Sequence, residues 1–196
     1  MWDESQRPYI LAAPVGFLIF FIGVCVAFLL DDEWMIIGYD LSDLGTMYRT
    51  LPAAVTFDYC CCLAGGLISV YGMGKCRFEK GLNYAAGVLF ILGGLGLVGL
   101  GICNADIRTA HNIVAGVFAI TMTAAIVVST FADYKDGYKY VLYASILILI
   151  YLIAEWPFFT RALSECMSIG SATVWFLVQI YKYWKIGVLS SPAKTE

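Results

Sequence analysis

Six long apolar stretches constrain this chain more than any other feature, because about 20 apolar residues are what an α-helix needs to cross a bilayer. The stretches cover residues 10–30, 53–73, 82–102, 111–131, 140–154 and 167–183. Hydrophobic residues make up 61% of the chain and charged residues 14%, which is far more apolar than an ordinary soluble domain. The sequence therefore predicts an all-α polytopic membrane bundle of six transmembrane helices, with residues 1–196 forming a single integral membrane domain.

Lysine and arginine residues are distributed unevenly between the two ends of this bundle. Of the 12 in the chain, all but Arg49, Arg108 and Arg161 fall on the side that also holds both termini. Basic residues accumulate in the cytoplasmic loops of membrane proteins. We therefore expect cytoplasmic N and C termini, an even number of helices and a multi-pass protein of the cell membrane.

The longest connection, residues 31–52, is predicted on the outer face and includes "YDLSDLGTMYRTLP" at residues 39–52. At about twenty residues it exceeds the usual connection between two helices, and loops of that length are often functional. One interpretation is a solvated turn in which Ser42 or Asp43 caps a short helix and Gly45 turns the chain. The other is a cap folded over the outer mouth of the bundle.

Further polar residues are predicted at the same depth as this loop. They are Asp58 at the start of the second helix, Asn104, Asp106, Arg108, His111 and Asn112 between the third and fourth, and Glu155, Arg161 and Glu165 around the last outer loop. Ionisable groups at the bilayer edge are costly unless they are paired or hydrated, so they mark candidate sites. They form either a ring of salt bridges that closes the bundle or a polar pocket open to the outer leaflet.

The sequence offers no ligand set for a metal or a cofactor. His111 is the only histidine, whereas zinc sites use three or four ligands and a haem held by two histidines needs a second one. The three cysteines of residues 60–62 point about 100° apart on a helix and cannot chelate one ion. Cys103 and Cys166, at the outer ends of helices, are candidates for a disulfide in an oxidising compartment. A net charge of −3 without a large basic surface argues against nucleic-acid binding.

Small residues recur every three or four positions in "GVLFILGGLGLVGLG", residues 87–101, and again in the second helix. Such spacings let the backbones of neighbouring helices approach closely. We read these glycines as packing positions. The same glycine-rich helices also offer a surface for a second copy of the chain or for another membrane protein.

The order of these motifs resembles a known family. "SDLG", then "FDY" opening a glycine-rich helix, then "GLGLVG" and then "AHNIVAGVF" is similar to the archaeal and bacterial membrane family called domain of unknown function 998. It is also similar to DRAM-like autophagy modulators and related GPI-lipid-remodelling proteins. The matching residues are Ser42, Asp43, Gly45, Phe57, Gly99, His111 and Glu165. Glu165 is followed by Cys166, where the eukaryotic relatives often have an acid–tryptophan pair, which favours the prokaryotic branch. The resemblance implies a fold and a candidate site without a reaction.

Two functions remain open. The first is recognition of a lipid headgroup or hydrophobic ligand at the outer leaflet, in a binding, sensing or scaffold role, with membrane lipids as partners. Its candidate residues are Arg49, Asp58, Arg108, Asn112 and Arg161. The second is a lipid-modifying hydrolase or transferase in which His111 acts as general base, oriented by Asp43 or Glu165. Ser42 is its candidate nucleophile. In both cases we expect Asp43 and Ser42 to turn inward and meet His111.

Overall fold

The computed structural model describes residues 4–155 and 160–186, in which the secondary-structure elements are all helices and no strand occurs. The elements in chain order are η1 (Glu4–Gln6), α1 (Arg7–Leu29), η2 (Leu41–Gly45), α2 (Leu51–Phe78), α3 (Leu82–Ile102), α4 (Arg108–Lys135), α5 (Lys139–Glu155) and α6 (Arg161–Lys185). Helices α1, α2, α3, α4 and α6 are long and apolar enough to cross a membrane, and α5 is a shorter apolar helix. The predicted all-α membrane bundle of six helices is confirmed.

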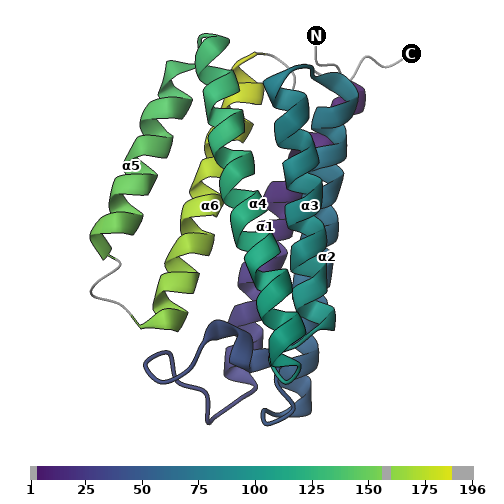
Figure 1. The fold of residues 1–196 in the computed structure, drawn as a ribbon, viewed down its shortest axis with the longest axis vertical. Helices are drawn as coiled ribbons and strands as arrows, with labels where there is room; N and C mark the ends of the chain where they lie inside the picture. Colours follow the sequence, from purple (N-terminus) through teal and green to yellow (C-terminus); the bar gives the residue numbers. More distant parts are fainter. Residues whose placement is uncertain (1–3, 156–159, 187–196) are drawn as a thin grey trace.

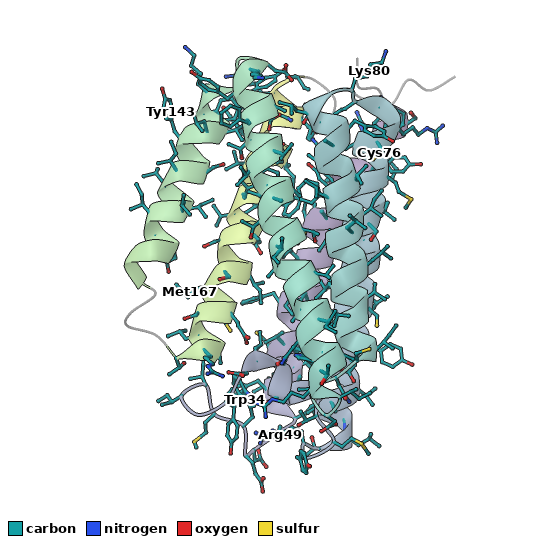
Figure 2. All side chains as sticks on the ribbon, viewed as in Figure 1. Trp34, Arg49, Cys76, Lys80, Tyr143 and Met167 are labelled. Carbon is teal, nitrogen blue, oxygen red and sulfur yellow. The ribbon has the colours of Figure 1, made fainter. Side chains whose placement is uncertain are left out.

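The six helices run roughly along one direction and define two ends of the bundle (Figure 1). The terminal end holds the start of α1, the end of α6 and the short turns after α2 and α4. The loop end holds residues 30–50, which connect α1 to α2, together with the α3–α4 turn. Figure 2 places Trp34 and Arg49 at the loop end and Cys76 and Lys80 at the terminal end. The outermost residues of both termini, 1–3 and 187–196, lie outside the described residues.

Helices α2 and α3 pack against each other through four glycines, Gly65 and Gly72 on α2 and Gly87 and Gly94 on α3, which we call the glycine seam. A Cβ atom added at Gly72 would lie 2.6 Å from the carbonyl oxygen of Gly87. A Cβ atom added at Gly65 would collide with the carbonyl oxygen of Gly94. The two backbones are therefore in direct contact, as the small-residue spacing predicts.

Four aromatic side chains join α2, α3 and α6 in the core. Tyr71, Phe90, Trp175 and Phe176 are each at most 1% exposed. Their rings lie with centroids between 5.0 and 5.9 Å apart, in edge-to-face and tilted arrangements. Such geometries are favoured because the positive edge of one ring meets the negative face of the next. This contact fixes α6 against the α2–α3 pair.

Candidate functional site

Asp31 closes the long loop onto itself at the loop end of the bundle. Its carboxylate accepts the backbone N–H groups of Glu33 at 3.1 Å, Trp34 at 2.8 Å and Thr50 at 3.0 Å. Arg49 Nη1 lies 3.6 Å from the same carboxylate. Burial alone would raise the pKa of Asp31, but these N–H groups and the Arg49 charge outweigh burial and lower the pKa. Asp31 is therefore a structural anchor that joins the two ends of the loop.

The "SDLG" motif forms η2 and docks on α2. The Asp43 carboxylate accepts the Asp40 backbone N–H at 2.8 Å, so Asp43 caps this short helix. Gly45 leaves no space for a side chain, because an added Cβ would lie 2.6 Å from Asp58 Oδ1 and 3.0 Å from Phe57 Cδ1. The glycine of the motif thus permits the close approach of η2 to α2.

Two carboxylates from other segments hold the loop in place over the bundle. Glu165 of α6 accepts the Leu41 backbone N–H through Oε2 at 2.7 Å. Asp106 of the α3–α4 turn accepts the Met47 backbone N–H through Oδ2 at 2.8 Å. The loop therefore contacts α6 and the α3–α4 turn and forms a roof over the space between them.

Two adjoining cavities lie beneath this roof. The polar chamber has a volume of about 740 Å³. Its charged lining residues are Glu33, Asp40, Asp43, Arg49, Asp106, Arg108 and Glu165. The apolar chamber has a volume of about 630 Å³ and lies among α1, α2, α3, α4 and α6. Its largest apolar lining residues are Phe20, Leu41, Phe57, Leu97, Leu100, Phe118 and Ile169.

Four residues line both chambers, and we call them the shared wall: Ser42, His111, Ala115 and Glu165. Three of them carry polar side chains. The two chambers thus meet at a polar boundary and form one cavity with a charged half and an apolar half. A molecule that occupies both halves contacts this wall.

His111 is 8% exposed and its Nδ1 lies 2.9 Å from the carbonyl oxygen of Cys103. A carbonyl oxygen only accepts hydrogen bonds, so Nδ1 carries the proton, and Nε2 of the neutral ring is an acceptor. The group that orients the ring is therefore a backbone carbonyl, and the expected carboxylate partners are engaged elsewhere: Asp43 caps η2 and Glu165 binds Leu41. Within the described ranges no hydrogen bond joins Asp43 to His111, although both line the polar chamber.

The other predicted site residues lie in three different places. Arg49, Arg108 and Asn112 line the polar chamber together with His111. Arg161 lines the apolar chamber, where its side chain is 82% exposed and lies 3.6 Å from Asp40. Asp58 is absent from the lining of both chambers. Its Oδ1 atom is buried against η2 without a hydrogen-bond partner among the residues that the structure describes.

All seven cysteines have free thiols, so the disulfide considered between Cys103 and Cys166 is not formed. The described part of the chain contains no group of three or more His, Cys, Asp or Glu side chains that could hold a metal ion.

Sequence reasoning missed a buried cluster at the terminal end. Asp133 of α4 accepts hydrogen bonds from Gln179 Nε2 and Lys182 Nζ of α6, both at 2.8 Å. We call these three residues the charge clamp, and each is at most 3% exposed. The count of basic residues places Lys182 on the cytoplasmic side and does not indicate its burial. The signal that could have revealed it is a pair of polar residues one turn apart on an otherwise apolar helix.

A helical bundle with five membrane-length apolar helices and a roofed cavity defines a polytopic membrane protein. The model of a family described as "Protein of unknown function (DUF998)" matches residues 14–180, and the chain belongs to this family. No curated protein and no solved structure matches the chain. The similarity to DRAM-like proteins and the location in the cell membrane therefore stay predictions.

Proposed function

We propose that this protein recognises a membrane amphiphile at its loop end. The apolar part of the ligand occupies the apolar chamber and its head occupies the polar chamber. The observation that carries the proposal is the shared wall, through which a charged cavity and an apolar cavity adjoin. Each volume lies within the range of about 300–1,000 Å³ that is usual for small-molecule sites.

The charges of the polar chamber select the head. Five acidic side chains and two arginines line it, so its net charge is negative. Such a lining repels a purely anionic head and attracts a positively charged group. Arg108 is exposed at the same chamber and is suited to a phosphate oxygen. We therefore propose a zwitterionic or cationic head that carries an ammonium group.

Glu165 is the residue through which the proposal can be tested. It belongs to the shared wall and so lies at the junction between head and chain. Glu165→Gln removes its negative charge but keeps an oxygen that can accept the Leu41 N–H. Asp32→Asn is the matched control, because Asp32 is exposed and lines neither chamber.

The experiment is native mass spectrometry of the purified protein with equimolar phosphatidylethanolamine and phosphatidylglycerol of identical acyl chains. We expect the wild type and Asp32→Asn to retain phosphatidylethanolamine preferentially. Glu165→Gln should reduce this preference about two- to fivefold, the effect of losing one partly exposed charge pair of about 0.5–1 kcal/mol. Retention of neither lipid, or a preference for phosphatidylglycerol in the wild type, overturns the proposal.

A second candidate function, catalysis on the bound lipid, is favoured by the tautomer of His111. Its Nδ1–H donates to Cys103, so the neutral ring has an acceptor nitrogen, as a general base requires. Ser42 lies on the same shared wall as the candidate nucleophile. Mass spectrometry of phosphatidylethanolamine incubated with the protein tests this function. A lyso-lipid or free headgroup that is lost in His111→Gln supports catalysis, whereas recovery of intact lipid refutes it.

A further inference from the structure

Helices α4 and α6 contact each other at the terminal end. The charge clamp joins them there through the two hydrogen bonds to Asp133. One turn earlier, Trp175 Nε1 donates to Thr130 Oγ1 at 3.1 Å. These side chains are almost completely buried. The terminal ends of the two helices are therefore fixed to each other.

Towards the loop end the same two helices diverge (Figure 1). The apolar chamber reaches the space between them, where its lining includes Ala115 and Ala119 of α4 and Ser164 and Ser168 of α6. Each helix thus contributes two small side chains one turn apart. Small side chains on both helices leave this space open.

The space between the two helices also reaches the lipid-facing surface. Ala119 and Ser168 are exposed although they line the chamber. Helix α5 packs against both α4 and α6, and its side chains Tyr143, Leu147 and Ile150 are at least 58% exposed. The apolar chamber thus reaches exposed positions on both α4 and α6.

Entry from the loop end is less favourable for an apolar chain. The roof is held by two hydrogen bonds, which the backbone N–H groups of Leu41 and Met47 donate to Glu165 and Asp106. A chain that entered there would pass the charged lining of the polar chamber and desolvate it. Entry between α4 and α6 passes the small, uncharged side chains of Ala115, Ala119, Ser164 and Ser168.

We propose that the gap between α4 and α6, lined by Ala115, Ala119, Ser164 and Ser168, is a lateral portal through which the acyl chain of the amphiphile enters from the bilayer. This inference rests on the proposed function, because it supplies the route to the same cavity. The charge clamp keeps the far ends of the two helices together, so the portal opens at the loop end alone.

Two variants narrow the portal from opposite sides, Ala119→Phe on α4 and Ser168→Phe on α6. The matched control is Ile120→Phe, because Ile120 follows Ala119 on α4, is 71% exposed and does not line the chamber. Two probes are used: phosphatidylethanolamine with a pyrene on its long acyl chain, delivered from vesicles, and water-soluble dibutyroyl phosphatidylethanolamine. Uptake of the first is followed by energy transfer from tryptophan to pyrene, and equilibrium binding of the second by calorimetry.

We expect each portal variant to slow uptake of the long-chain probe about tenfold, a barrier increase of about 1.4 kcal/mol. Ile120→Phe should behave as the wild type with both probes, whereas each portal variant should slow uptake of the long-chain probe more than it weakens binding of the short-chain probe. Unchanged long-chain uptake in both portal variants, with short-chain binding intact, overturns the portal and leaves the proposed function standing. Binding of neither probe to the wild type overturns the proposed function and the portal with it.

Discussion

Replacing Asp133 by asparagine should destabilise the protein strongly, because Asp133 belongs to a buried ion pair at the terminal end. The Asp133 side chain is 1% exposed and the Lys182 side chain 4%, and their charged atoms lie 2.8 Å apart. Removing one partner of a buried ion pair leaves the other charge uncompensated, at a cost of about 3–5 kcal/mol. For a chain of this length each kcal/mol shifts the melting temperature by about 2–4 °C, so the expected decrease is about 6–20 °C.

The assay is thermal unfolding of purified protein in one detergent, followed by intrinsic fluorescence at a fixed scan rate. Asp136→Asn is the matched control, since Asp136 is exposed and should change stability by no more than about 0.5 kcal/mol. The double variant Asp133→Leu/Lys182→Met removes both charges and should recover most of the loss, because apolar replacement of a whole buried pair is often neutral. Equal melting temperatures for Asp133→Asn and Asp136→Asn would refute the buried-pair reasoning.

Three further predictions concern the long loop and the orientation of the bundle in the membrane. Folding lowers the pKa of Asp31, so the ionised carboxylate stabilises the folded protein above its unfolded pKa of about 3.9. This contribution is lost as the pH falls further. The melting temperature should therefore decrease below about pH 4, and should decrease less in Asp31→Asn. Gly45→Ala should lower the free energy of unfolding by about 1–3 kcal/mol, because the added methyl group overpacks against Asp58. Adding Asp58→Ala should restore part of this loss. An unchanged melting temperature in Gly45→Ala would contradict the contact. If the termini are cytoplasmic, an impermeant thiol reagent added to intact cells should label Tyr48→Cys and not Lys80→Cys, each introduced into a cysteine-free variant. The reverse pattern would contradict the predicted orientation.

The helices could be predicted from the sequence because the number of apolar residues in a membrane-spanning helix depends on the thickness of the bilayer and hardly on neighbouring helices. Their ends could not be predicted as well. Helix α6 begins at Arg161, six residues before the predicted 167, because its first turns are polar and Thr160 caps them by accepting the Leu163 N–H. Hydropathy does not detect a polar turn that continues an apolar helix.

The sequence predicts a common depth for the polar residues but not the partners of each one. Ser42, Asp43, His111 and Glu165 all line one chamber. However, His111 pairs with a backbone carbonyl, and a sequence contains no information on which carbonyl a fold will present. The sequence likewise does not distinguish the adjacent acids Asp31 and Asp32. Asp31 is buried because the end of the loop, at Thr50, hydrogen-bonds to it, whereas Asp32 is exposed.

The glycine seam affects what membership of this family implies. Gly65, Gly72, Gly87 and Gly94 are required by the distance between two helix axes, since a side chain at any of them would collide with the facing helix. Gly99, in the motif that carries the family resemblance, meets Val114 of α4 in the same way. A relative that shares only these glycines is therefore expected to have the same helix packing, but the glycines do not indicate the same site chemistry. Relatives with the same ligand should instead be sought by the residues of the shared wall.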